Sequence, residues 1–209
     1  MPAKKVQKKN IGASESGSAK PNAIVLAGLR LFTLYGYRKT SIDDIAQAAQ
    51  VAKRTVYLHF ENKAAVFLAI LEYLGDRVRQ RFAAAERAGG TAVERLTGLL
   101  DAYFGMGFEL FNKSEHMPEL EETFSKLART RIGDLNTEYE DRLARFFRSL
   151  QKKGEIGVPP QGLSVEQIVH ILMGAAEGAK HDPKVQGDRK ALDRRLRELA
   201  IFAIATMRK

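Results

Sequence analysis

Residues 40–63 read TSIDDIAQAAQVAKRTVYLHFENK, and this stretch decides how the rest of the chain is interpreted. Ser41 is a suitable helix N-cap, and Asp44 three residues later gives capping-box spacing with Asp in place of Glu or Gln. Apolar side chains then recur at the spacing of one helical face, at Ile42, Ile45, Ala46 and Ala49. The stretch therefore predicts a short helix after Ser41 that packs closely against a neighbour.

A second short helix is expected to begin near Lys53, after a turn of about three residues. Val56 and Phe60 repeat four positions apart and should point inward. The remaining side chains are of types that contact phosphates or base edges: Lys53, Arg54, Thr55, Tyr57 and His59. Residue types alone would also fit a solvated basic face over an ordinary core. The spacing of the whole stretch favours a helix-turn-helix that places its second helix in the DNA major groove.

Helices are also predicted on both sides of this motif. Pro21 in a first turn and Gly36 at the end bound a helix over Pro21–Tyr35. Its apolar face carries Ile24, Ala27, Leu31, Phe32 and Tyr35. After the motif, Asn62 can cap a helix that continues to about Ala88 and joins the motif to the rest of the protein. Lys63 and the free N–H groups at its start would suit a DNA phosphate.

Residues 24–67 resemble the DNA-binding head of the TetR family of bacterial transcription regulators, a match over about a fifth of the chain. The residues that carry the resemblance are Gly36, Thr40, Ile45, Ala46, Val51, Thr55, Tyr57, His59, Phe60 and Lys63. The resemblance implies an all-α fold, with a three-helix head and a C-terminal bundle of about six helices. The full set of expected DNA contacts is Thr40, Ser41, Lys53, Arg54, Thr55, Tyr57, His59 and Lys63.

Three positions depart from the family pattern. Gln50 stands where Gly is frequent, and a left-handed backbone there would cost about 1–2 kcal/mol. Ala52 stands where Ser is common, so the second helix loses a side-chain cap worth about 1 kcal/mol. Arg54 replaces a usually small residue and suggests a base preference of its own.

Composition limits the classes of protein to consider. The chain has 209 residues, 44% of them hydrophobic, and no cysteine, which excludes disulfides and thiolate metal sites. Four scattered histidines make a metal site unexpected, and no cofactor is indicated. There is no apolar signal-peptide region and no run long enough to span a bilayer. We therefore expect a soluble cytoplasmic protein, associated with the nucleoid and without a membrane partner.

Positive charge is concentrated at the N-terminal end. Residues 1–63 hold eleven Lys or Arg against four Asp or Glu, or +7 of the total +9. This distribution is typical of nucleic-acid binding, although a solubilising tail would produce the same excess. Residues 1–20 are rich in Lys, Ser and Gly and are expected to form a disordered basic arm. The arm could follow phosphates or the minor groove, or attract DNA without specificity.

Three regions are expected: the arm at 1–20, the DNA-binding head at 21–66, and an effector-binding and dimerisation domain at 67–209. Helices in this last region are predicted at 91–111, 118–128, 133–153, 164–180 and 189–207. Thr91 with Glu94, and Ser164 with Gln167, have capping-box spacing. Residues 154–162, GEIGVPPQG, are predicted to form a loop.

The bundle could hold a ligand between facing helices, with apolar walls and a few polar anchors. The candidate lining residues are Tyr103, Phe108, Phe124, Tyr139, Phe147, His170, Met173 and Glu177. Each could equally be ordinary core or surface. The family resemblance supports a cavity, because TetR-like regulators bind a small inducer in this region; the identity of the effector is unknown.

The last two helices carry broad, partly small-residue faces. These faces comprise Ile168, Ile171, Leu172, Ala175, Ala176 and Ala179, and then Leu192, Leu196, Leu199, Phe202, Ala203 and Met207. The resemblance assigns this pair to a homodimer, whereas closing the monomer's own core would require the same pattern. Binding to a palindromic operator requires a dimer with recognition helices about 34–36 Å apart, or a multiple of that distance.

Other functional classes are less well supported by the sequence. We find no Walker loop, dinucleotide-binding glycine pattern, G-x-S-x-G or H-E-x-x-H motif, and therefore expect no enzyme. A helical bundle that binds only a small molecule, or binds DNA without operator choice, remains the alternative. The favoured interpretation is a homodimeric regulator of palindromic double-stranded DNA, with repression as the expected sign of control.

Overall fold

The computed structural model describes residues 15–112, 114–160 and 162–207, which form ten α-helices and one π-helical segment. In chain order these are α1 (Glu15–Tyr35), α2 (Ile42–Ala48), α3 (Lys53–His59), α4 (Lys63–Arg87), α5 (Ala92–Leu100), η1 (Asp101–Gly105), α6 (Met106–Phe111), α7 (Met117–Leu127), α8 (Arg129–Lys152), α9 (Val165–Lys180) and α10 (Arg189–Thr206). No strand occurs in these ranges, so the prediction of an all-α fold is confirmed.

The first helix starts earlier than predicted. α1 begins at Glu15, so Glu15–Lys20 are helical, and Pro21 lies inside the helix instead of in its first turn. Proline lacks an N–H group, so one carbonyl in the preceding turn loses its helical donor while the helix continues. The lysines of the predicted basic arm, Lys4, Lys5, Lys8 and Lys9, lie outside the described residues.

Helices α1, α2 and α3 form the head and share one small core. Ile24, Ile45 and Val56, one residue from each helix, are all fully buried. The predicted capping box at α2 is confirmed: the Ser41 hydroxyl accepts the Asp44 N–H, and the Asp44 carboxylate accepts the Ser41 N–H. Gly36 follows the last residue of α1 with φ of +81°, as expected for a residue that ends a helix.

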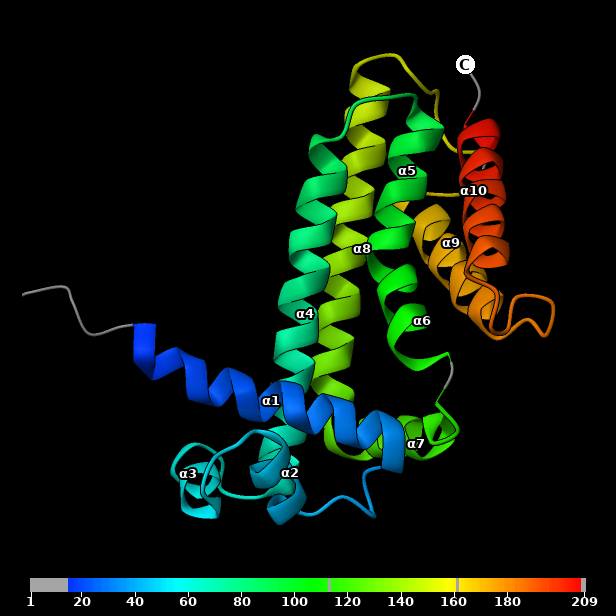
Figure 1. Cartoon of the computed structure of the whole chain (residues 1–209). Helices are drawn as coiled ribbons and strands as arrows, with labels where there is room; N and C mark the ends of the chain where they lie inside the picture. The colour runs from blue at the N-terminus through cyan, green and yellow to red at the C-terminus, as the bar shows by residue number, and fades with distance from the viewer. Residues whose placement is uncertain (1–14, 113, 161, 208–209) are drawn as a thin grey trace, which may run out of the picture.

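Helix α4 joins the head to the body, and the Asn62 side chain caps it as predicted. α1 crosses the lower end of α4, with α2 and α3 beneath it, while α4, α5 and α8 run along the body (Figure 1). The head's core does not end at residue 66, where the sequence placed the domain boundary. It continues along α4 to Leu74 and includes Met106, Leu120 and Ala128 from the body.

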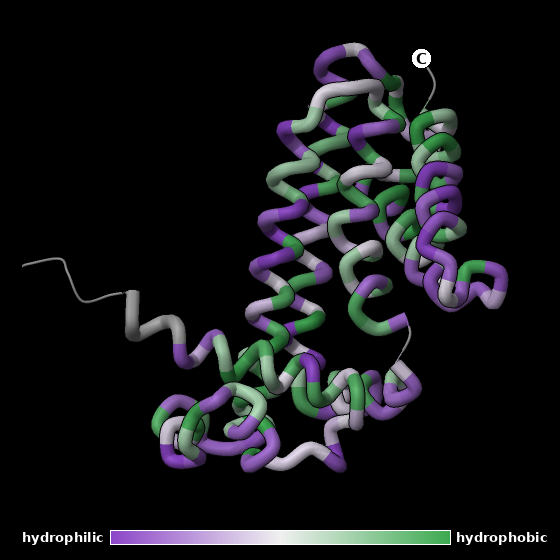
Figure 2. Tube along the Cα trace, viewed as in Figure 1, coloured by the Kyte–Doolittle hydropathy of each residue, from purple (hydrophilic) through white to green (hydrophobic). Residues whose placement is uncertain are grey.

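The body is a helical bundle around a second core. Phe82, Leu99, Leu143, Phe147 and Leu196 come from four different helices and are fully buried there. Figure 2 shows hydrophobic and hydrophilic residues alternating along these helices, as expected for helices that bury one face. The predicted capping boxes at Thr91 and Ser164 are confirmed. No helix in the described ranges is long and apolar enough to cross a membrane.

The helix predicted over 91–111 has an irregular centre. It consists of α5 and α6 with the π-helical segment η1 between them. A Cβ atom at Gly105 would collide with the Asp101 carboxylate, so glycine is needed where that side chain folds back over the helix. Single π-helical turns are rare and frequently lie at functional sites. Here the segment brings Tyr103 to the wall of a cavity.

Candidate functional site

The helix α3 is held by its inner face and presents its outer face to solvent. Val56 is fully buried, whereas Arg54 and His59 are exposed and Tyr57 is 50% exposed. Thr55, also predicted as a DNA contact, is half-buried. The structure therefore brings the predicted residues of this helix together, with four of the five exposed: Lys53, Arg54, Tyr57 and His59.

Sequence reasoning missed Leu58, which is 71% exposed on the same helix. An exposed leucine between Tyr57 and His59 can contact a thymine methyl group, which is the apolar feature of the major groove. Leu58 stands in the Tyr57-Leu58-His59 string that carries the family resemblance. Its position outside the Val56–Phe60 face could have identified it.

The turn before α3 has the strained backbone and the missing helix cap that the sequence predicted. Gln50 adopts φ of +55°, so a left-handed backbone falls on a non-glycine residue. Ala52 occupies the N-cap of α3 and provides no side-chain hydrogen bond. An ion pair crosses the turn instead, since the Lys53 ammonium lies 2.9 Å from an Asp43 carboxylate oxygen. The hydrogen bond to Asp43 raises the pKa of Lys53.

The roles predicted for Thr40 and Ser41 need correction. Thr40 is 3% exposed, and its hydroxyl donates to the Gly36 carbonyl oxygen at 2.8 Å. It therefore stabilises the turn between α1 and α2 and is too deep to contact DNA. Ser41 is exposed, but its hydroxyl donates to the Asp44 carboxylate at 2.6 Å and accepts the Asp44 N–H at 3.1 Å. The capping box thus occupies this hydroxyl.

Lys63 also has a different role from the phosphate contact predicted for it. Its ammonium donates to the carbonyl oxygens of Tyr37 at 2.7 Å, Thr40 at 2.8 Å and Arg38 at 3.4 Å. An ammonium has three N–H donors, so these bonds leave none for a phosphate. Burial lowers the pKa of Lys63, an effect that the nearby Glu119 carboxylate opposes. Lys63 therefore fixes the α1–α2 turn, residues 36–40, to the start of α4.

The body contains a cavity of about 800 Å³ between α4, η1, α6, α7, α8 and α9. Five of the eight predicted residues line it: Tyr103, Phe124, His170, Met173 and Glu177. Other lining residues are mostly apolar, among them Leu71, Leu74, Phe111, Ile132 and Leu135. An apolar cavity with a few polar groups is the usual form of a small-molecule site. A cavity therefore lies between facing helices of the bundle, and ligand binding in it stays a prediction.

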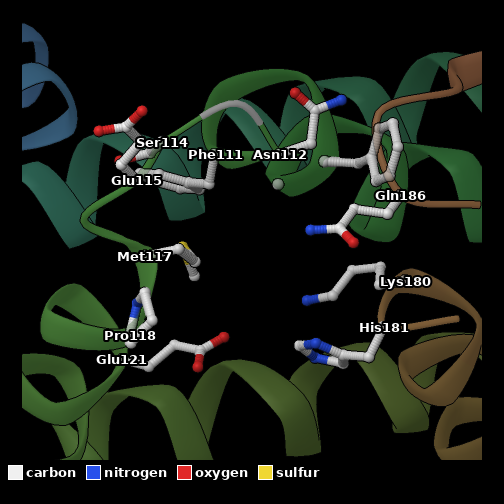
Figure 3. Close-up of a pocket in the computed structure, with 12 residues that line it drawn as sticks. Phe111, Asn112, Ser114, Glu115, Met117, Pro118, Glu121, Lys180, His181 and Gln186 are labelled. Atoms are coloured by element: carbon white, nitrogen blue, oxygen red, sulfur yellow. The ribbon is translucent and has the colours of Figure 1, made fainter. Parts of the chain in front are cut away.

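Three predicted lining residues lie elsewhere. Tyr139 and Phe147 belong to the buried core, and the Tyr139 hydroxyl donates to the Leu99 carbonyl oxygen. Phe108 lines an adjoining chamber of about 460 Å³. The two chambers share Gly107, Phe111, Met117, Glu121, Lys180 and His181. In Figure 3, Lys180, His181 and Gln186 extend from one wall of this smaller chamber toward Met117 and Glu121 on the other.

Ionisable side chains occur at several points of the larger cavity. Tyr103 donates its hydroxyl to Asn136, and burial raises the pKa of Tyr103 to about 12, with Glu177 and Glu140 acting in the same direction. Burial alone would raise the pKa of Glu177, but Lys180 at 2.8 Å and His181 at 3.1 Å together lower it. Among the residues that the structure describes, no three potential metal ligands come together.

The last two helices divide their apolar residues between the interior and the surface. Most of the predicted residues close the monomer's own core: Ile168, Leu172, Ala176, Ala179, Leu192, Leu196, Ala203 and Met207. Two predicted residues stay exposed, Ile171 at 54% and Phe202 at 66%, and Ile201, which was not predicted, is 47% exposed beside Phe202 in the sequence. Ala175 is exposed as well, and Leu199 is half-buried. Most of this pattern therefore closes the monomer's own core, while a smaller apolar face lies on the surface of the same pair of helices.

Comparison with known proteins agrees with this geometry. Residues 24–70 match the profile of the family described as bacterial regulatory proteins, tetR family. The chain is 30% identical to the transcriptional regulator AcuR of Cereibacter sphaeroides over 154 residues, which cover 69% of this chain and 68% of AcuR. It is 27% identical to the HTH-type transcriptional repressor DhaR of Mycobacterium sp. (strain GP1) over 81% of this chain and 85% of DhaR.

Solved structures show the same fold. The fatty acid degradation regulator FadR from Bacillus halodurans superposes with a TM-score of 0.69 at 20% sequence identity, over 97% of this chain and 99% of FadR. The exposed face of α3, the profile match and the similarity to AcuR over two thirds of both chains lead to the same conclusion. The chain belongs to the TetR family of bacterial regulatory proteins and is a DNA-binding transcriptional regulator.

Proposed function

We propose that the protein is a homodimeric repressor that binds a palindromic operator through α3 and leaves it when a small molecule enters the cavity. The observation that carries the DNA-binding part is the outer face of α3. Arg54, Tyr57 and His59 are exposed there, while Val56 anchors the helix from the opposite side. A helix held in this way can enter the major groove without disturbing the core of the head.

The proposed DNA contacts are Lys53, Arg54, Tyr57, Leu58 and His59. Arg54 offers a planar guanidinium that can bind guanine or a phosphate in bidentate fashion. Tyr57 can donate its hydroxyl to a phosphate, and Leu58 can contact a thymine methyl group. Lys53 can exchange its exposed ion pair with Asp43 for a phosphate, because such surface pairs contribute only about 0–1 kcal/mol.

Dimerisation is proposed to use the outer faces of α9 and α10. Ile171, Ile201 and Phe202 are exposed apolar side chains on these two helices. Along α9, Gly174, Ala175 and Gly178 are exposed with Ile171, and such small residues allow helices to approach closely. Two copies related by a two-fold axis would form a four-helix interface and present two recognition helices to one palindrome.

Control by a small molecule is proposed from the cavity in the body. The cavity touches α4, which carries the head, so a ligand that fits only one tilt of α4 would favour one spacing of the recognition helices. A difference of about 1–3 kcal/mol between the two states is enough for a moderate response. The repressor DhaR, similar over most of its length, supports repression as the sign of control.

Selection of bound DNA from a random pool tests the proposed function. We expect an inverted repeat, with half-site centres about 10–10.5 base pairs or a multiple of this apart. Compounds can then be screened for release of the selected site. Recovery of a random pool without enrichment would contradict operator choice and favour a charge-driven binder.

A further inference from the structure

Helix α7 has one face in the ligand cavity and another on the head. Met117, Glu121, Phe124 and Ser125 line the cavity, at spacings of one helical face. Leu120, between them, is 1% exposed and belongs to the core of the head. The same short helix therefore meets both the site proposed for the effector and the domain proposed for DNA.

Polar contacts from α7 hold the α1–α2 turn. The Arg38 backbone N–H donates to a Glu119 carboxylate oxygen at 2.6 Å, and the Arg38 guanidinium donates to Glu122 at 2.8 Å. Just before α7, the Ser114 hydroxyl donates to the Thr33 carbonyl oxygen at 2.7 Å. Of these, the bond to the backbone N–H fixes main-chain position most directly, because it is charge-assisted and independent of a flexible side chain on the turn.

The fit between Glu119 and this turn is close. At Gly36 an added Cβ atom would lie 2.5 Å from a Glu119 carboxylate oxygen, so the side chain occupies the space that glycine leaves. Lys63 of α4 binds carbonyl oxygens of the same turn. Two helices therefore hold the turn: Lys63 of α4 binds carbonyl oxygens of the turn, and Glu119 of α7 accepts a backbone N–H of the turn.

An aromatic series follows the same route through the core. Phe124 of the cavity wall packs on Phe67 of α4 with ring centroids 4.9 Å apart. Phe67 in turn packs on Tyr37 of the turn at 5.3 Å. Packed rings therefore connect α7 to the turn in addition to the Glu119 bond, and α2 begins two residues after the turn ends.

We propose that α7 transmits occupancy of the cavity to the helix-turn-helix through the α1–α2 turn, with Glu119 as the positioning residue. This inference rests on the proposed function, since it assigns a route to the proposed control. A ligand that displaces Met117, Glu121 or Phe124 shifts α7, weakens the Glu119 bond to Arg38 and frees the turn that orients α2 and α3. α4 then acts together with α7, not alone.

Because the ligand is unidentified, the test fills the cavity with a larger side chain introduced by mutation. Gly107 lines both chambers, and an added Cβ there would meet no atom within 4 Å, so Gly107→Phe fills cavity space from α6. Gly133→Phe on α8 is the matched control. That glycine, like Gly107, is helical and has no neighbour within 4 Å of an added Cβ, but it is exposed where Gly107 is half-buried, and it lines neither chamber. Gly107→Leu is the smaller alternative if the phenylalanine variant unfolds early in a thermal scan.

The readout is amide hydrogen exchange of residues 36–41, which measures local opening and needs no DNA. We expect Gly107→Phe to accelerate this exchange about 5- to 150-fold, the usual range of coupling between sites, and Gly133→Phe to leave it unchanged. Glu119→Ala should accelerate it too, and adding Gly107→Phe to that variant should change it little further. Glu119→Gln keeps an acceptor oxygen and should restore part of the response.

Three results would overturn the inference. The first is unchanged exchange of residues 36–41 in both Gly107→Phe and Gly107→Leu. The second is an acceleration by Gly133→Phe equal to that by Gly107→Phe. The third is that Gly107→Phe accelerates exchange by the same factor in the Glu119→Ala variant as in the wild type. The selection of an operator is a separate experiment. Its failure would remove the proposed function, whereas coupling between cavity and turn would still be measured by exchange.

Discussion

The ammonium of Lys63 lies 2.7 Å from the carbonyl oxygen of Tyr37 and 4.4 Å from the centroid of the Tyr37 ring. The first contact fixes the backbone of the α1–α2 turn, and the second adds a cation–π attraction. A lysine at the start of a helix near DNA is readily taken for a phosphate ligand. In this protein the Lys63 ammonium binds carbonyl oxygens of the head instead.

Lys63→Met should therefore lower the stability of the protein and leave the electrostatic part of its DNA affinity unchanged. We expect a loss of about 1–3 kcal/mol in the free energy of unfolding, because hydrogen bonds from a charged donor to partly buried carbonyl oxygens are removed. The dependence of operator affinity on salt should keep its slope. Lys39→Met, which changes an exposed lysine of the same turn, is the control and should leave stability unaltered. A slope lower by about one unit in Lys63→Met would restore the phosphate role.

Arg54→Ala and Tyr57→Ala should weaken operator binding without unfolding the head. Both side chains are exposed and neither belongs to the hydrophobic core. Each contact to a base or phosphate is worth about 1–3 kcal/mol, so we expect losses of about 5- to 150-fold in affinity. Fluorescence anisotropy measures the affinity, and sedimentation should show an unchanged oligomeric state. Unaltered affinity in both variants would mean that α3 does not face DNA.

Gln50→Gly should stabilise the protein. Gln50 has a left-handed backbone, which costs a non-glycine residue about 1–2 kcal/mol. Glycine removes this strain but also raises the conformational entropy of the unfolded chain, which offsets part of the gain in stability. The expected net gain in the free energy of unfolding is about 0.5–1 kcal/mol, measured by urea denaturation. Gln47→Gly, inside the regular helix α2, should instead destabilise by a similar amount. A loss at position 50 would show that the Gln50 side chain has a stabilising contact.

The capping box of α2 should fail in acid. Hydrogen bonds from the Ser41 hydroxyl and N–H lower the pKa of Asp44 below its ordinary value of 3.8. An acid whose pKa is lower in the folded state stabilises that state above the ordinary pKa, and the benefit disappears as pH falls through the folded value. The stability difference between wild type and Asp44→Asn should thus be constant near neutral pH, shrink as the pH falls below 3.8 and vanish below the lowered pKa of Asp44. Denaturant titrations at several pH values measure it; a difference that grows in acid would exclude this account.

Phe202→Glu should dissociate the proposed dimer. Phe202 is 66% exposed on α10, so a charge there costs the monomer little but would be buried between two copies. Leu26→Glu changes another exposed apolar residue, 46% exposed on α1, and should leave the assembly intact. Sedimentation velocity distinguishes the two states. If both variants sediment as wild type does, the dimer uses another surface or does not form.

Features encoded within one or two helical turns were predictable from the sequence. The capping boxes at Ser41, Thr91 and Ser164 need only residues three apart, and the structure contains all three. The inward direction of Val56 follows from helical periodicity in the same way. The early start of α1 was missed because Glu15–Lys20 have no apolar periodicity and Pro21 resembles a first-turn residue.

Contacts between distant segments were not predictable. The carbonyl partners of Lys63 lie 23 to 26 residues earlier, and nothing local indicates that its side chain turns toward them. Whether an aromatic residue faces cavity or core depends on how its helix is rotated in the bundle. Phe124 lines the cavity and Phe147 does not, although both lie on amphipathic helices of the same bundle. The bond between Glu119 and Arg38 likewise requires the packing of α7 on the head.

The affinity of the dimer for its selected palindrome, measured against a scrambled duplex of equal length and composition at about 150 mM salt, tests the central claim most directly. We expect the palindrome to bind at least about a thousandfold more tightly, with the ratio falling sharply in the Arg54→Ala, Tyr57→Ala double variant. Equal affinity for both duplexes, with a steep dependence on salt, would show a protein held to DNA by charge alone and would contradict the account.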